Sequence, residues 1–235
     1  MRFLPAGDLA VSVELGEEIS AEVNTRVRAL EYVIQQKAPP GIVEMVPSYR
    51  SLLVYYDPAV VGYDALCGQL AALAEQATSA ATPPARDVEL PCCYDAELGL
   101  DLETAARQLR LSVDELVRLH TGATWVVYFI GFTPGLPYMT GGPERLTIPR
   151  LDSPRTNVPA GSVGIGGVQC CVYSVESPGG FRILGRTPLR LYDPDATDPV
   201  LLRPGDHVRF RPIDRHEFDD LAARVAAGDV RPVIR

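Results

Sequence analysis

Hydrophobic and polar positions in the first third of the chain follow two periods in turn. Residues 9–15 alternate between apolar and polar side chains, the pattern of a half-buried strand. From residue 20 to residue 36 the apolar side chains recur at helical spacing, until Pro39 and Pro40 end the run. The whole pattern predicts a βαββα domain of the α+β class, with a strand at 9–15, a helix at 20–36, strands at 42–46 and 52–56, and a helix at 63–74.

A short segment of small residues, threonine and proline, residues 78–85, interrupts this pattern. Segments of this composition bury little, so we expect a linker between two domains, residues 1–80 and 81–235. In the second domain short apolar runs follow one another between glycine- and proline-rich turns, which is typical of a closed or sandwiched β domain. The predicted strands are 88–92, 125–132, 162–165, 168–173, 181–184 and 207–210, and the predicted helices are 101–109, one that opens at Ser112, and 217–226.

Composition excludes several kinds of partner. The 235-residue chain has a formal net charge of -8, which repels nucleic acid and anionic membranes. Hydrophobic residues make up 46%, enough for packed cores. No run approaches the roughly 18 apolar residues of a membrane span. Pro5, Gly7 and Asp8 interrupt the first residues before the apolar core of a secretory leader could form, so we expect a cytoplasmic protein.

The chain offers few types of side chain for catalysis or ligand binding. Lys37 is the only lysine, so anions have to be recognised by arginine, whose planar fork suits carboxylates and phosphates. The five cysteines include the adjacent pairs Cys92–Cys93 and Cys170–Cys171, and adjacent residues on a strand point to opposite faces. Such pairs suit neither a disulfide nor a zinc site, so we expect buried reduced thiols and no set of metal ligands.

Glycine and proline concentrate in residues 131–188, which hold 11 of the 20 glycines and 8 of the 21 prolines. Loops of this kind let a ligand approach the main chain closely, so the segment is either a binding site on a β scaffold or the turn chemistry of a small barrel. Its glycine-rich stretch 161–167 lacks the Gly-Lys-Ser/Thr ending and a following helix, which excludes a P-loop.

Several motifs resemble those of one protein family. Residues 131–138 read GFTPGLPY, close to GFxPGFPY, and residues 154–163 resemble PR..VPAGSV. Residues 177–181 and 184–188 resemble SPGGW and IGRTP, and residues 46–52 of the first domain fit the same family. Together these stretches resemble the PxpB/KipI family, also called allophanate hydrolase subunit 1, over nearly the whole chain.

The resemblance implies a cyclophilin-like β-barrel for the second domain and a partner of the PxpC type, or allophanate hydrolase subunit 2. With a PxpA-type protein, such a pair opens 5-oxo-L-proline to L-glutamate at the expense of ATP. The resemblance thus implies one subunit of a 5-oxoprolinase, inactive by itself, with ATP bound at the assembled complex. Leu136 stands where the family has Phe, and Cys170–Cys171 where Thr-Gly is expected, which changes the shape of the pocket.

Hydrolysis of a lactam places demands on the site, because the amide reacts only once its oxygen carries a phosphoryl group and cations hold the developing charge. Arg155 and Arg186, each beside a proline, are the candidate cations; alternatively, each satisfies a loop carbonyl at the surface. His120 is a candidate acid or base, or a helix-end residue that caps carbonyls. We expect Gln169 to hold a substrate amide and Tyr138 to line the same cleft, unless the glutamine faces solvent and the tyrosine only packs.

Two other functions fit this sequence. The same pair of subunits also serves other amide or urea chemistry, such as allophanate hydrolysis or carboxyl transfer to urea, although the chain has no biotin-carrying or amidase segment. KipI-type relatives instead act without catalysis, as inhibitors of a sensor histidine kinase. A cleft dense in polar side chains favours the enzyme over the inhibitor.

Overall fold

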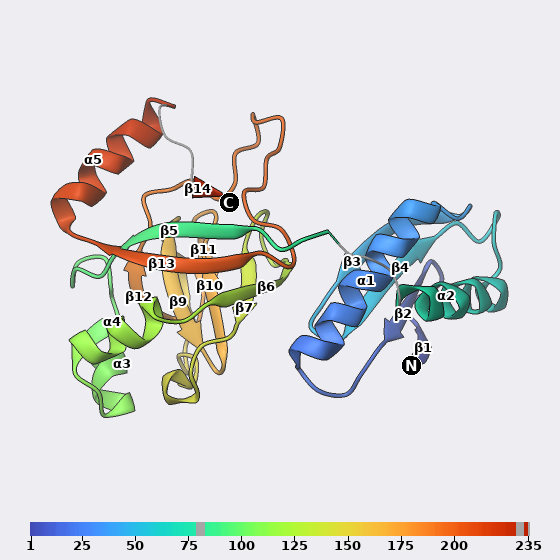
Figure 1. Ribbon diagram of the computed structural model, residues 1–235, viewed down its shortest axis with the longest axis horizontal. Helices are drawn as coiled ribbons and strands as arrows, with labels where there is room; N and C mark the ends of the chain where they lie inside the picture. The colour runs from blue at the N-terminus through green and yellow to red at the C-terminus, as the bar shows by residue number, and fades with distance from the viewer. Residues whose placement is uncertain (79–82, 229–232, 235) are drawn as a thin grey trace. The chain divides into compact units, whose positions relative to one another are not determined.

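The computed structural model describes residues 1–78, 83–228 and 233–234 of the chain. The chain divides into two compact units, Met1–Pro84 and Ala85–Arg235 (Figure 1). Each unit has a hydrophobic core of its own. Of the predicted linker 78–85, residues 79–82 lie outside the described part. Within the described part, no helix has the length and apolar character needed to cross a membrane.

The N-terminal unit is a four-stranded antiparallel sheet with two helices on one face. In sheet order the strands are β1 (Arg2–Pro5), β2 (Ala10–Glu14), β4 (Ser51–Tyr56) and β3 (Ile42–Pro47), and the helices are α1 (Ala21–Lys37) and α2 (Tyr63–Ala77). Alternate residues of β2 and β4, such as Val11, Val13 and Val54, pack under the helices. The hydroxyl of Ser20 accepts a hydrogen bond from the backbone N–H of Val23 and caps α1.

The predicted βαββα order is found from β2 to α2, with each element within three residues of its expected ends. Strand β1 was not predicted. It is an edge strand whose residues are mostly exposed, so no apolar alternation marks it, and an edge position tolerates Pro5.

The C-terminal unit is built on a closed β-barrel of seven strands, which confirms the predicted mainly-β barrel. Around the barrel the order is β12, β9, β10, β7, β6, β13 and β5, and a pairing of β12 with β5 closes it. Strands β5 and β13 come from opposite ends of the domain sequence and pair in parallel. The barrel strands are β5 (Asp87–Cys93), β6 (Trp125–Ile130), β7 (Pro137–Thr140), β9 (Ser162–Gly166), β10 (Gln169–Val172), β12 (Arg182–Arg186) and β13 (His207–Ile213).

Shorter elements surround the barrel. Helix α3 packs on β12 and α4 packs on β13. The hydroxyl of Ser112 accepts a hydrogen bond from the N–H of Glu115, so the predicted cap of α4 is confirmed. The surrounding elements are α3 (Leu102–Leu109), α4 (Val113–Thr121), the 3-10 turn η1 (Glu144–Leu146), the paired strands β8 (Arg155–Val158) and β11 (Ser177–Gly179), α5 (Arg215–Ala226), and β14 (Val233–Ile234), which pairs with β5.

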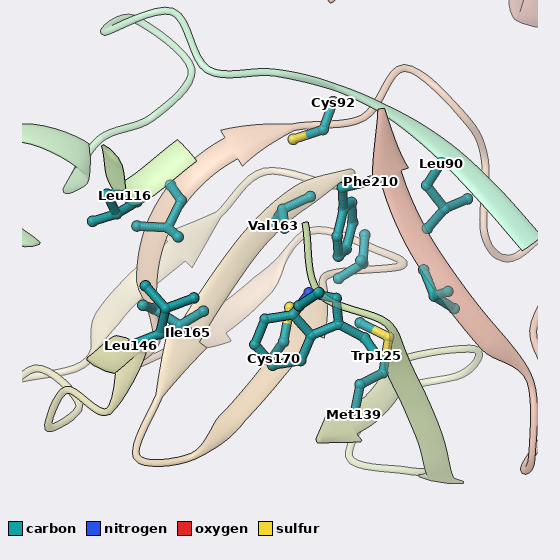
Figure 2. Close-up of a cluster of buried hydrophobic side chains, with 14 of the residues drawn as sticks. Leu90, Cys92, Leu116, Trp125, Met139, Leu146, Val163, Ile165, Cys170 and Phe210 are labelled. Atoms are coloured by element: carbon teal, nitrogen blue, oxygen red, sulfur yellow. The ribbon is translucent and has the colours of Figure 1, made fainter. Parts of the chain in front are cut away.

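Inward-facing apolar side chains pack together inside the barrel. Figure 2 shows Trp125, Met139, Val163 and Phe210 among them, each at most 2% exposed. The barrel is therefore a packed core rather than a channel, and any binding site lies at its ends or on its outer surface.

The adjacent cysteines divide between faces, as the sequence predicts. Cys92 and Cys170 belong to the barrel core, whereas Cys171 packs in a cluster with Val158 of β8, and Cys93 packs against α5. All of them are buried free thiols, and burial raises the pKa of Cys170 well above its usual value.

Strands β7, β8 and β11 were missed by the sequence prediction. Each has at most four residues, and each contains proline or an exposed polar run, so neither length nor alternation distinguishes it from a loop. They form because partners distant in the chain supply the pairing: β7 lies between β6 and β10, and β8 and β11 pair with each other.

Candidate functional site

His120, the predicted acid or base, lies inside the barrel. Its Nδ1 is 2.8 Å from the hydroxyl of Tyr94, its Nε2 is 3.6 Å from the sulfur of Cys170, and its ring packs between Trp125 and Phe210. The side chain is fully buried, and this burial lowers the pKa of His120 to about 3, so the imidazole is neutral at pH 7. The placement does not support a catalytic role, because a substrate would reach the ring only by opening the core.

Arg155 is an ion-paired residue rather than a free cation. Its guanidinium donates two hydrogen bonds, of 2.8 and 2.7 Å, to the carboxylate of Asp101, which also accepts from the backbone N–H of Ile183 at 2.7 Å. The carboxylate raises the pKa of Arg155. Arg155 therefore joins β8 to the start of α3 and to β12, and its charge is already balanced, so the predicted role on a reaction intermediate is not supported.

Gln169 opens β10 and is held by an arginine that the sequence analysis did not single out. Nη2 of Arg150 donates to Oε1 of Gln169 at 2.6 Å, and the same guanidinium lies 4.4 Å from the ring centroid of Phe181. Gln169 also lines a pocket of about 220 Å³, together with Trp125. Its predicted role in binding a ligand thus has a concave site beside it.

Tyr138 packs on the outer surface of the barrel. Its ring stacks on Phe129 with centroids 4.6 Å apart, and it lies opposite Cys171 in the β7–β10 register. Burial raises the pKa of Tyr138. Packing accounts for this position, and a contact between Tyr138 and substrate stays a prediction.

The glycine- and proline-rich loops meet at one end of the barrel. The N–H of Thr187 donates to the carbonyl of Gly161 at 2.9 Å, and the N–H of Gly161 donates to Tyr173 at 2.7 Å. The hydroxyl of Ser174 donates to the carbonyl of Pro134 at 2.5 Å. Gly161 has φ 83, and a Cβ atom there would lie 2.3 Å from the carbonyl oxygen of Thr187, so only glycine fits. The loops that carry the family motifs therefore form one surface.

Arg186 projects from the end of β12 into this surface, which we call the motif-loop end. Its Nε donates to the carbonyl of Ala160 at 2.7 Å, and the side chain is half-buried. Burial lowers the pKa of Arg186, while the nearby carboxylate of Glu176 partly opposes the shift. Among the described residues it forms no ion pair. A fixed guanidinium with free terminal nitrogens is suited to a carboxylate or phosphoryl group.

The structure does not bring the predicted site residues into one cleft. Arg186 pairs with Ser162 at one end of β9, whereas Gln169 pairs with Gly166 at the other end. Four residues of strand span roughly 13 Å, more than a small substrate covers. The sequence places both residues in one glycine-rich segment, but that segment crosses the barrel several times and supplies turns at both ends.

Two further residues at these sites, Asp101 and Arg150, gave no sequence signal of their roles. Asp101 and Arg150 matter through partners that are distant in the chain. Phe132, at the tip of the motif loop, is 66% exposed and has φ 68, a left-handed conformation that is uncommon for a bulky residue. Within the described part of the chain, no cluster of three or more His, Cys, Asp or Glu side chains could hold a metal ion.

Comparison with known proteins identifies relatives over most of the chain. Residues 1–202 match the family described as carboxyltransferase domain, subdomain C and D. The chain is 40% identical over 226 residues to the B-type 5-oxoprolinase subunit of Bacillus subtilis (strain 168), covering 90% of this chain and 92% of that protein. It is 28% identical over 244 residues to the urea amidolyase of Lachancea kluyveri, covering 91% of this chain and 13% of that protein.

A solved structure agrees with these matches. The crystal structure of TTHA0988 superposes with a TM-score of 0.78 at 38% identity, covering 87% of this chain and 40% of that one. The closed barrel, the motif-loop end and the family match thus define a protein of the carboxyltransferase-domain class. Within this class the chain belongs to the PxpB/KipI family, the family of the B-type 5-oxoprolinase subunits, which confirms the resemblance seen in the motifs.

Proposed function

We propose that this chain is the PxpB-type subunit of an ATP-dependent 5-oxoprolinase, which converts 5-oxo-L-proline to L-glutamate together with PxpC- and PxpA-type subunits. Three relatives named as B-type 5-oxoprolinase subunits are 36–40% identical and match nearly their whole length. The urea amidolyases are more distant, and this chain covers only 13% of each of two such proteins.

The observation that carries the proposal is Arg186 at the motif-loop end. A half-buried guanidinium fixed by Ala160 offers its terminal nitrogens to an anion without first breaking an ion pair. The substrate carries a carboxylate, and phosphorylation of its lactam oxygen adds further negative charge. A preorganised cation stabilises that charge more than mobile water does, because its orientation is fixed before the reaction. Arg186 thus binds the anionic substrate or intermediate.

The nucleotide and the remaining catalytic groups come from the assembled complex. The glycine-rich stretch of this chain lacks a P-loop lysine, and the imidazole of His120 is buried. Arg155 is neutralised by Asp101. The motif-loop end therefore supplies part of a site that a PxpC-type partner completes, and the isolated chain has little or no turnover.

The test is purification of this chain alone, of its PxpC- and PxpA-type partners without it, and of the three together. ATP hydrolysis is measured with and without 5-oxo-L-proline, and with urea as the competing substrate. The proposal is supported if 5-oxo-L-proline stimulates ATP hydrolysis only when all three proteins are present. Robust stimulated turnover by this chain alone, or stimulation by urea in place of 5-oxo-L-proline, contradicts it.

A further inference from the structure

A pocket of about 220 Å³ opens beside the tip of the β9–β10 hairpin, at the end of β9 opposite Arg186. Trp125 lines it together with residues 142–144, 146–147 and 167–169. A Cβ atom on Gly142 would lie 2.2 Å from Cη2 of Trp125, so the main chain can pack on the indole only at a glycine. The pocket is thus built from close main-chain contacts rather than left between mobile side chains.

Hydrogen bonds hold these lining segments in place. Gly167, with φ 61, starts the two-residue turn from β9 to β10, the geometry in which glycine is preferred at the first position. Its N–H donates to the carbonyl of Ile148 at 2.6 Å, and the N–H of Ile148 donates back to Gly167 at 3.3 Å. The hairpin tip is therefore tied to the segment that follows η1, and a ligand would meet a preformed site.

The hydrogen bond from Arg150 determines which way the side-chain amide of Gln169 is oriented. A guanidinium can only donate, so the atom that faces Arg150 at 2.6 Å is the carbonyl oxygen of Gln169. Arg150 itself is positioned by the ring of Phe181. The amide nitrogen of Gln169 makes no hydrogen bond to another described residue. Gln169 thus offers two N–H donors beside the pocket.

The charges around the pocket select the ligand. Glu144 is the one charged residue among its lining residues, all of which are described, and the guanidinium of Arg150 is held outside this set by Gln169 and the ring of Phe181. The carboxylate of Glu144 disfavours a carboxylate or phosphate, whereas a neutral carbonyl accepts from Gln169 and an adjacent N–H donates to Glu144. We infer that this pocket binds a small uncharged amide, that is, a lactam, carboxamide or urea, at a site separate from the motif-loop end.

The full chain can report this binding directly, because Trp125 is the only tryptophan. Its fluorescence is followed while 2-pyrrolidinone, a neutral lactam, is added. We expect a saturable change, with a weaker response to N-methyl-2-pyrrolidinone, which lacks the N–H. The anion 5-oxoproline should produce no change at the same concentrations. A non-saturable response to 2-pyrrolidinone, or a stronger response to 5-oxoproline, would overturn the inference.

Two variants separate this pocket from the proposed active site. Gln169→Glu keeps the shape of the side chain but removes the donors, and should weaken the binding of 2-pyrrolidinone by about tenfold or more, ~1.4 kcal/mol. Arg186→Lys lies at the other end of β9 and should leave the fluorescence titration unchanged. Equal affinity in Gln169→Glu, with the thermal midpoint preserved, refutes the pocket assignment. Since the titration needs neither ATP nor partners, failure of the 5-oxoprolinase proposal would leave it intact.

Discussion

The hydroxyl of Tyr94 lies 2.8 Å from Nδ1 of His120, among the apolar side chains and thiols of the barrel core. Because Cys170 sits on the opposite side of the imidazole, at 3.6 Å from Nε2, both ring nitrogens have a partner. Burial raises the pKa of Tyr94 well above its usual value and lowers that of His120 to about 3. Both groups are therefore neutral, and the network is stable only while the imidazole stays unprotonated.

This network predicts a loss of stability in acid. The pKa of His120 is about 3 in the folded chain and about 6.5 when unfolded, so the unfolded state binds the proton first as the pH falls. The stabilisation from neutral His120 is complete above pH 6.5 and is lost as the pH falls from 6.5 towards 3. The expected slope is about 1.4 kcal/mol per pH unit in the free energy of unfolding. Urea denaturation between pH 4 and 7 measures it.

Carboxylates also titrate in acid, so the control is His120→Phe, which cannot take up a proton. The variant loses the hydrogen bond to Tyr94 and is less stable at pH 7, but its free energy of unfolding should fall less steeply between pH 6.5 and 4. Identical slopes for the two proteins would show that His120 does not carry the acid sensitivity.

The ion pair of Arg155 and Asp101 predicts a second effect on stability. Arg155→Ala leaves a carboxylate that is 7% exposed and whose one remaining hydrogen-bond partner, among the residues that the structure describes, is the N–H of Ile183. We expect a loss of about 2 kcal/mol, below the full cost of breaking a buried pair because Arg155 is 29% exposed. Arg145→Ala is the matched control, since its pair with Glu115 is exposed and should contribute less than about 0.5 kcal/mol. Similar losses in both variants, measured by urea denaturation, contradict a structural role for Arg155.

Local patterns predicted the fold well where elements are long. Helix α1 follows from apolar residues at helical spacing, and β2 from the alternation of apolar and polar residues. The opposite facing of Cys170 and Cys171 follows from strand geometry alone. Short strands such as β8 were not predicted because they are stabilised by pairing with residues distant in the chain. Such pairing produces no recognisable pattern within a four-residue segment.

The site was harder to predict than the fold. Proximity in sequence suggested that Gln169 and Arg186 share a cleft. However, Gln169 starts β10 and Arg186 ends β12, and both strands pair antiparallel with β9, so the two residues lie at opposite ends of β9. The partner of a charged residue is equally hard to predict, because no sequence pattern indicates that Arg155 pairs with Asp101, 54 residues away. The motifs identified the family, whereas the role of each arginine could be assigned only from the residues that contact it in the structure.

The two units should fold independently, because their cores share no residues. Residues 85–235 expressed alone should give a cooperative thermal transition and the near-ultraviolet circular dichroism of a packed Trp125. Limited proteolysis of the full chain should cut first within the predicted linker 78–85. Early cleavage inside α3 or α4, or a residue 85–235 fragment that lacks a cooperative transition, argues against this division.

The last prediction concerns Arg186. Arg186→Lys keeps the positive charge but loses the planar fork, so a carboxylate or phosphoryl group can no longer be held by two parallel hydrogen bonds. If the guanidinium serves the reaction, turnover of the assembled complex should fall by roughly tenfold or more, about 1.4 kcal/mol. The thermal midpoint of this protein should barely change, because among the described residues Arg186 has no ion pair to lose and its hydrogen bond to Ala160 is a single neutral contact. Arg190→Lys, an exposed arginine near the same end, is the control and should retain full turnover. Full activity in Arg186→Lys, or a loss of activity that follows unfolding, removes Arg186 from the site.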